Sequence, residues 1–112
     1  MDFGLTVDDT QPGYTILNVA GEVDLATAPD LRTQLLELIN LDKVNLIVNL
    51  EPVTFLDSTG LGVLVSAHNR ARSEGGDLTL VCTRESLLKV FEITGLSTVF
   101  AIHDSLAAAT RD

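Results

Sequence analysis

The sequence predicts an α/β domain with a largely parallel central β-sheet, and three features support this prediction. Short runs rich in β-branched residues alternate with longer segments whose apolar residues recur at helical spacing. The run NLIVNL (45–50) is nearly continuously apolar, which is typical of a strand covered on both faces. Two strand-like runs near the start, separated by a turn, predict an antiparallel hairpin. The expected order is β-β-α-β-α-β-α-β-α, in a single domain spanning residues 1–112.

The two strands of the hairpin are expected over 3–9 and 14–23. FGLTVDD alternates apolar and polar residues at the two-residue period of a strand, and YTILNVAGEV is rich in β-branched residues. Asp9, Pro12 and Gly13 lie between the two runs, and these residue types favour a turn.

A first helix is expected within DLATAPDLRTQLLELIN (24–40). Thr27 followed by Asp30 resembles a capping box, and Pro29 is tolerated in a first helical turn. Apolar residues spaced by three and four positions form one stripe along this helix, namely Leu31, Leu35, Leu38 and Ile39.

The second half of the chain continues the alternation of helices and strands. The segment LGVLVSAHNRARSEGG (61–76) predicts a helix with Leu61, Leu64, Val65 and His68 on one face. The further expected elements are a strand over 77–82, a helix capped by Thr83 and stopped by Gly95, a strand over 98–102 and a short helix over 104–112.

Composition restricts the classes of function. Sixteen acidic residues against seven basic ones give a formal charge of −9, which disfavours binding to nucleic-acid phosphates. No apolar run reaches the roughly 18 residues of a membrane span, and the N-terminus does not resemble a signal peptide. A single cysteine, Cys82, fits a reducing compartment and a place in the core of a strand. We therefore expect a cytoplasmic protein that binds neither nucleic acid nor membrane directly.

The segment TFLDSTGLG (54–62) is the most informative, because it joins the central strand to the next helix. Asp57 and Ser58 are expected beyond the carboxyl end of that strand, where sites in such sheets gather, and at a helix N-terminus. A cap and a turn would explain each residue alone, since Asp and Ser are favoured N-caps. However, three consecutive capping candidates are present, and Gly60 and Gly62 each cost a helix about 1 kcal/mol relative to alanine. This combination favours a surface that another molecule approaches closely.

The segment FLDSTGLGVLV resembles the phosphorylation-site segment of anti-sigma factor antagonists, the small single-domain members of the STAS family. The likeness extends over nearly the whole chain, because GEVDLATAPDLR, the paired glycines before DLTLV, and RESLLKVFEITGL follow the family's order. The resemblance implies the STAS fold, a central mixed sheet with an N-terminal hairpin and helices packed mainly on one side. One departure is Asn49, at a strand position where many members carry aspartate.

The resemblance also implies a binding protein that is switched by phosphorylation and is not an enzyme. In this family the unphosphorylated antagonist binds an anti-sigma factor that is also a serine kinase, and a sigma factor is released. The kinase then phosphorylates the antagonist and ends the binding, which a PP2C-type phosphatase restores. The matching phosphoacceptor is Ser58, with Thr59 as the near alternative. The implied partner-binding residues are Asp24 and Thr27 after the second strand, and Asp57, Ser58, Thr59, Gly60, Leu61 and Gly62 at the junction.

Two other binding or signalling roles are alternatives. A STAS domain can serve another signalling assembly. A two-component receiver domain would instead be phosphorylated on Asp57 and would need an acidic pair for Mg²⁺, for which Asp8 and Asp9 are the candidates. A receiver also needs a lysine beyond its last strand, where this chain has His103 and Asp104.

An enzyme would use Ser58 as a nucleophile with His68 or His103 as its base. The hydrolase motif G-x-S-x-G is absent because Leu56 stands at its first glycine, and His68 lies about 15 Å along the same helix from the serine. The chain has no P-loop and no cluster of ligands at metal spacing, so we expect no cofactor and no metal.

Overall fold

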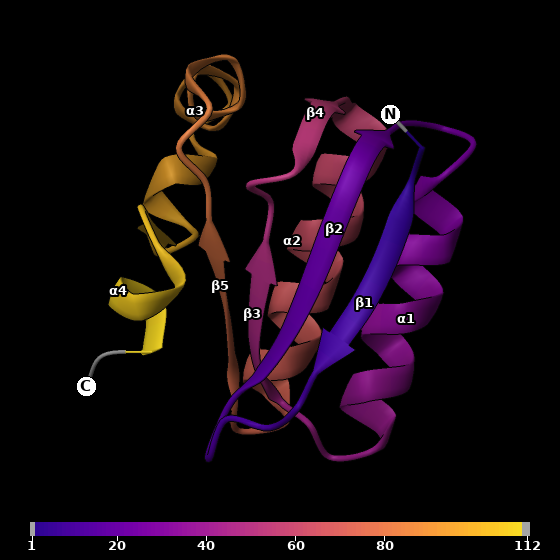
Figure 1. Ribbon diagram of the computed structural model, residues 1–112, viewed down its shortest axis with the longest axis vertical. Helices are drawn as coiled ribbons and strands as arrows, with labels where there is room; N and C mark the ends of the chain where they lie inside the picture. The colour runs from indigo at the N-terminus through magenta and orange to yellow at the C-terminus, as the bar shows by residue number, and fades with distance from the viewer. Residues whose placement is uncertain (1, 111–112) are drawn as a thin grey trace.

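The computed structural model describes residues 2–110 and places a mixed β-sheet at the centre of the molecule (Figure 1). Strands β1, β2, β3, β5 and β6 follow one another across the sheet, and β4 pairs with β2. The first two strands are antiparallel, and the other pairs are parallel. The strands are β1 (Gly4–Asp8), β2 (Thr15–Val23), β3 (Asn45–Asn49), β4 (Val53–Leu56), β5 (Asp77–Val81) and β6 (Ile102–His103).

Helices cover mainly one face of the sheet. In Figure 1, α1 and α2 both lie behind the strands, and the two helices pack on each other. The helices are α1 (Ala28–Asn40), α2 (Ser58–Ser73), α3 (Glu85–Ile93) and α4 (Leu106–Thr110). This arrangement confirms the predicted fold class. Within residues 2–110, no helix combines the length and the apolar character that a membrane crossing demands.

The core has a large part and a small part. The large cluster lies on the α1 and α2 side and contains the predicted stripe of the first helix together with Leu17, Val48 and Leu64. A smaller cluster on the other face joins Ile47 to Ala109 of α4. Strand β3 therefore buries alternate residues on both faces, which is why its sequence is continuously apolar.

Strand β4 was not predicted. The sequence suggested that the junction follows the central strand directly, but β3 ends at Asn49 and a turn leads into β4 before Asp57 is reached. The strand has four residues, of which the middle two are exposed, so it lacks the two-residue period by which strands are found.

The last predicted strand exists as β6, but it is shorter than the predicted range 98–102 and begins four residues later. Gly95, with a φ of 77°, follows α3 and leads into a short 3₁₀ helix (Leu96–Thr98), whereas β6 contains only Ile102 and His103. The carbonyl oxygen of Leu96 accepts hydrogen bonds from the backbone N–H groups of Val99 and Phe100. Phe100 is buried through this turn, edge-on to the ring of Phe91, without belonging to a strand.

Helix boundaries also differ from expectation at three places. The side chain of Thr27 does not cap α1, and the residue before α3 is Arg84 rather than Thr83. Helix α2 begins at Ser58, earlier than the apolar periodicity suggested, because Asp57 caps it. The C-terminal helix is confirmed over Leu106–Thr110, and the remainder of that prediction, 111–112, lies outside the described residues.

Candidate phosphorylation and docking site

Asp57 fixes the start of helix α2. Its carboxylate oxygen Oδ1 accepts a hydrogen bond from the backbone N–H of Gly60 at 3.1 Å, which is the geometry of an N-cap. Its own backbone N–H donates to the carbonyl oxygen of Val23 at 3.2 Å, and its carbonyl oxygen accepts from Leu61 at 3.0 Å. Asp57 therefore ties the beginning of α2 to the end of β2.

Ser58 is the first residue of α2, and its side chain is exposed to solvent. Thr59, the alternative phosphoacceptor, is half-buried. The N-terminus of this 16-residue helix carries unpaired N–H groups and a partial positive charge, which are favourable to a phosphate. The structure thus makes Ser58 the more accessible hydroxyl and places it where added negative charge is tolerated.

The two glycines of this segment have different surroundings. Gly60 is buried, and a Cβ atom built on it would lie 2.6 Å from Cδ1 of Leu56 and 2.7 Å from Cγ1 of Val23. Gly62 is exposed, and a Cβ atom there would meet no other heavy atom within 4 Å. Neither glycine has a positive φ. Gly60 is therefore required by internal packing, whereas Gly62 leaves the outer surface of α2 open.

The β2–α1 loop is held by its own polar side chains. Oδ1 of Asp24 accepts hydrogen bonds from the backbone N–H groups of Ala26 at 2.9 Å and Thr27 at 3.1 Å. The hydroxyl of Thr27 donates to the carbonyl oxygen of Glu22 at 2.7 Å and accepts from the N–H of Asp24 at 3.0 Å. The capping box predicted for Thr27 is thus replaced by a loop in which Asp24 and Thr27 hold each other.

Parallel pairing of β2 with β4 brings the two predicted segments together. Val23 is opposite Leu56 in this pair, so Asp24 and Asp57 follow their strands at the same edge of the sheet. This edge is the upper end of the molecule in Figure 1. Among the predicted contact residues, Leu61 and Gly60 are buried, and Leu61 belongs to the main core. They support the site from within and do not form its surface.

Sequence reasoning missed Phe55, which the structure exposes beside the site. The pairing register shifts by one residue between Gly21 and Glu22, so that Gly21 faces Val53 and Glu22 faces Phe55. Thr54 is the extra residue of this β-bulge. As a result, Val53 and Leu56 are both buried, while Phe55 points outward. Its exposure depends on the bulge, for which the sequence carries no periodic signal.

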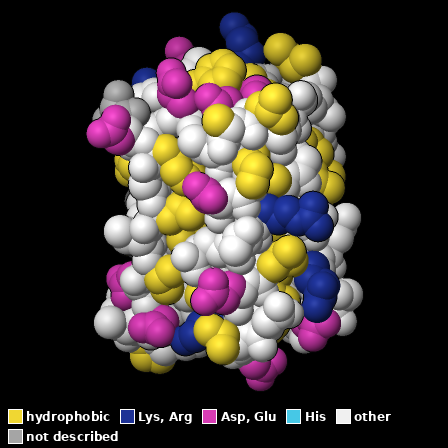
Figure 2. Space-filling view, turned by 90° about the vertical axis from the view of Figure 1, so that its right-hand side faces the viewer, with side chains coloured by type: hydrophobic (Ala, Val, Ile, Leu, Met, Phe, Trp, Pro, Cys, Tyr) yellow, Lys and Arg dark blue, Asp and Glu magenta, His cyan; other side chains and the backbone are white. Residues whose placement is uncertain are grey.

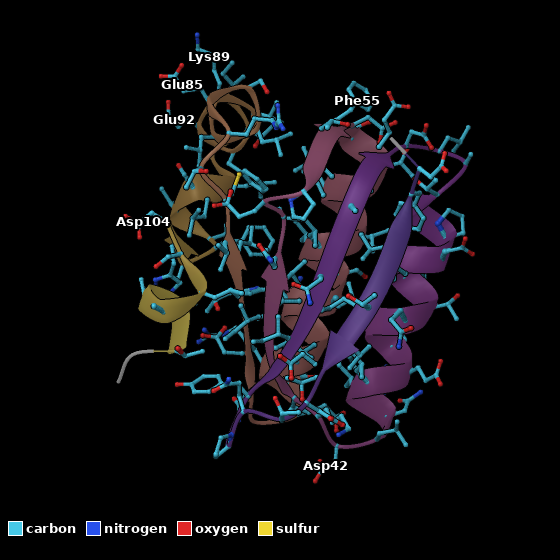
Figure 3. The ribbon with its side chains drawn as sticks, in the orientation of Figure 1. Asp42, Phe55, Glu85, Lys89, Glu92 and Asp104 are labelled. Carbon is cyan, nitrogen blue, oxygen red and sulfur yellow. The ribbon has the colours of Figure 1, made fainter. Side chains whose placement is uncertain are left out.

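The structure does not assemble the receiver-like site. Asp9 pairs with Lys43 at 2.9 Å, at the end of the molecule where Figure 3 labels Asp42, whereas Asp57 lies at the opposite end of the sheet. Asp8, on the same hairpin, bonds to Thr10. Within residues 2–110, no group of three His, Cys, Asp or Glu side chains could hold a metal ion.

The structure does not pair Ser58 with a histidine either. His68 is buried, with Nε2 3.6 Å from Oδ1 of Asp77 and its ring edge-on to Phe100. His103 forms part of β6. Cys82 is buried as predicted, although it directly follows β5 and is not part of the strand. Burial raises the pKa of its thiol, which makes it a poor nucleophile.

Comparison with known proteins identifies the family of this chain. The family model described as "STAS domain" matches residues 7–109. The chain belongs to the STAS domain family. An anti-sigma-B factor antagonist of Bacillus subtilis (strain 168) is 40% identical over 86 residues, which are 77% of this STAS protein and 78% of the relative.

Solved structures show the same architecture. An anti-sigma factor antagonist from Mycobacterium paratuberculosis has a TM-score of 0.88 and 27% identity, covering 96% of this chain and 91% of its own. The phosphorylated form of the Bacillus cell fate determinant SpoIIAA has a TM-score of 0.73 and 20% identity, covering 94% of this chain and 96% of its own. The second likeness is one of fold.

Proposed function

We propose that this STAS protein is an anti-sigma factor antagonist whose binding to an anti-sigma factor is ended by phosphorylation of Ser58. The observation that carries the proposal is the exposed Ser58 hydroxyl at the N-terminus of α2, next to the cap formed by Asp57. The motif around it and the names of the relatives support the same function.

The chemistry of the switch follows from where the phosphate would lie. A phosphate adds about −1.5 to −2 charges near neutral pH. The helix N-terminus accepts this charge, so the domain stays folded. A partner packed against the small neutral hydroxyl would instead have to enclose a dianion beside the carboxylate of Asp57. A difference of about 3–5 kcal/mol in binding free energy is enough to change the complex from mostly bound to mostly free.

The proposed partners are an anti-sigma factor that is also a serine kinase, and a PP2C-type phosphatase, acting in the cytoplasm. The unphosphorylated form binds the anti-sigma factor and frees a sigma factor. The contact surface includes Asp24, Thr27, Asp57, Ser58, Thr59 and Gly62, and Gly60 and Leu61 hold it from below. In this role the protein works by binding and carries out no reaction of its own.

Phosphorylation is tested with purified anti-sigma kinases encoded in the same genome, ATP and intact-mass measurement. We expect one added phosphate in the wild type, mapped to Ser58, and none in Ser58→Ala. Thr59→Val serves as the control and should still be modified. Phosphate found on Thr59 alone would reject the assignment to Ser58.

Binding is tested with the same proteins in the absence of ATP. Ser58→Ala should bind the anti-sigma factor as the wild type does, because alanine keeps the surface small and neutral. Ser58→Asp should bind more weakly, since it adds a single negative charge. If Ser58→Ala folds normally but no longer binds a partner that the wild type binds, phosphorylation is not the element that controls the complex.

A further inference from the structure

Phe55 is presented to solvent by the β-bulge of β4. In a regular strand, residues alternate between the two faces, so Phe55 would follow Val53 into the core and Leu56 would point outward. The bulge at Thr54 reverses this assignment, and Phe55 is 48% exposed. Bulges commonly redirect a side chain next to a functional site. An aromatic ring held outside the core in this way is suited to binding another surface.

Leu25 is a second exposed apolar side chain at the same end of the molecule. It lies in the loop that Asp24 and Thr27 hold through their hydrogen bonds, and it is 75% exposed. Because the backbone on both sides of Leu25 is fixed, its side chain can be buried by a partner with little loss of backbone entropy.

Acidic groups accompany these two apolar side chains. Glu22 pairs with Phe55 across β2 and β4, Asp24 precedes Leu25, and Asp57 follows β4. Figure 2 shows hydrophobic and acidic side chains next to one another at the upper end of the molecule, where Lys or Arg side chains also lie, and Figure 3 labels Phe55 at this end. An apolar centre with a charged rim is the usual composition of a protein-binding surface.

We propose that Leu25 and Phe55 are two apolar anchors by which this protein docks on its anti-sigma factor, whose contact face is apolar with basic side chains at its rim. This inference rests on the proposed function, since it names the contacts of the same surface. The acidic rim selects a basic counterpart and accelerates encounter, while burial of the two side chains supplies most of the affinity. The surface is continuous with the phosphorylation site, because β4 leads through Asp57 into Ser58.

The position of the anchors explains why one phosphate is decisive. Ser58 lies three residues after Phe55 in the segment that joins β4 to α2, so a partner that encloses the phenyl ring would approach the serine. A phosphate on Ser58 would then lose its water beside the carboxylate of Asp57, which costs free energy. The partner could bury the two anchors only if it also met this cost.

The test measures binding to the purified anti-sigma factor of the same genome by titration calorimetry, using unphosphorylated protein. Phe55→Ala and Leu25→Ala should each weaken binding by about tenfold or more, as truncation of a central anchor does. Phe55→Leu should recover part of the loss. Leu41→Ala is the matched control, because Leu41 is 62% exposed but precedes Asp42 at the opposite end of the molecule (Figure 3), and it should change the Kd by less than about twofold.

The outcomes separate the two proposals. If the wild type binds and both anchor variants keep the wild-type Kd while remaining folded by circular dichroism, the anchors are rejected and the proposed function stands. Equal losses in Leu41→Ala and the anchor variants would also reject them, because the effect would not be confined to this surface. If the wild type binds no anti-sigma factor of its genome, the proposed function is rejected, and the anchors that rest on it are rejected as well. Raising the salt concentration should weaken wild-type binding, and a salt-independent Kd would contradict the basic rim.

Discussion

At the scale of single residues, Gly60 and Gly62 differ in their roles. Gly60 is needed for packing inside the protein, whereas Gly62 leaves the outer surface of α2 accessible. Gly60→Ala must place a methyl group against Val23 and Leu56, and overpacking of this kind costs about 1–3 kcal/mol, partly offset by better helix propensity. Gly62→Ala adds a methyl group in open space and should stabilise the helix by up to about 1 kcal/mol. Urea denaturation of both variants should therefore move the midpoint in opposite directions. A loss of stability in both would contradict this assignment.

The same pair of variants also reports on docking. If a partner approaches the outer surface of α2 closely, Gly62→Ala should weaken binding to the anti-sigma factor although it makes the free protein more stable. Such a combination is hard to produce through misfolding. Unchanged binding of Gly62→Ala would place the partner away from this turn of the helix.

At the scale of elements, β4 is held from its outer side by the segment that precedes α3. The carboxylate of Glu51 accepts hydrogen bonds from the backbone N–H of Thr83 at 3.0 Å and from its hydroxyl at 2.8 Å. Nε of Arg84 donates to the carbonyl oxygen of Val53 at 3.0 Å. These bonds matter because, within residues 2–110, β4 pairs with no strand other than β2.

Removing the Glu51 carboxylate should therefore loosen β4. We expect Glu51→Ala to lower the free energy of unfolding by about 1 kcal/mol and to speed amide hydrogen exchange over Val53–Leu56. Thr98→Val is the control, because the hydroxyl of Thr98 bonds only locally, to the carbonyl oxygen of Gly95 at 2.7 Å. Faster exchange in the control but not in Glu51→Ala would show that these bonds do not hold the strand.

The β1–β2 hairpin is tied to the loop before β3 by the pair of Asp9 and Lys43. The hydrogen bond from Lys43 and then its positive charge hold the pKa of Asp9 below the usual range. A carboxyl group with a lowered folded-state pKa contributes stability above its unfolded-state pKa, and this contribution is lost as pH falls through the folded-state value. Both side chains are substantially exposed, so the contribution is small.

This pair predicts a pH effect in solution. In Lys43→Met the pKa of Asp9 should rise, as followed by NMR titration of its carboxyl carbon, and the acid side of the stability profile should become slightly flatter. The carboxyl of Asp8, whose pKa is lowered chiefly by the hydrogen bond from the Thr10 hydroxyl, is the internal reference and should change little. An unchanged Asp9 titration would mean that the pair does not persist in solution.

At the scale of the whole molecule, the sequence predicted the elements that have a strong period. β1 and α1 were found because their apolar residues recur at the spacing of a strand and a helix, β2 because it is rich in β-branched residues, and β3 because burial on both faces makes it continuously apolar. The missed strand β4 and the misplaced strand over 98–102 have one cause. β4 contains a bulge and Phe100 is buried through a turn, so neither segment follows a regular period.

The candidate site was predicted in part. Ser58 and Asp57 could be found because their residue types and spacing form a motif. The exposure of Phe55 could not, because it depends on the register between β2 and β4, which involves residues far apart in the chain. The burial of Leu61 and the closeness of Gly60 to Val23 likewise arise from tertiary packing. Motif reasoning therefore selected the residues at the centre of the candidate site, which stay a prediction, and could not select Phe55.

The whole molecule should keep its fold when it is phosphorylated. Ser58 is exposed, and Asp57 already supplies the cap of α2, so a phosphate breaks no internal contact. We expect the phosphorylated protein to have a thermal midpoint within about 3 °C of the unmodified one, which corresponds to less than about 1 kcal/mol. Exchange rates should change only near the start of α2. Widespread loss of protection would mean that the switch acts by unfolding the domain.

The bulge in β4 also makes this segment sensitive to changes in its length. Thr54 is the residue that the pairing with β2 does not need, so a shortened chain lacking it could form a regular strand that still buries Val53 and Leu56. An inserted residue after Phe55 could not be accommodated in the pairing with β2 in this way. It would shift Leu56 toward solvent and displace the start of α2 from Val23. Among variants of this protein that differ in length, this segment should therefore tolerate a deletion at Thr54 better than an insertion one step later.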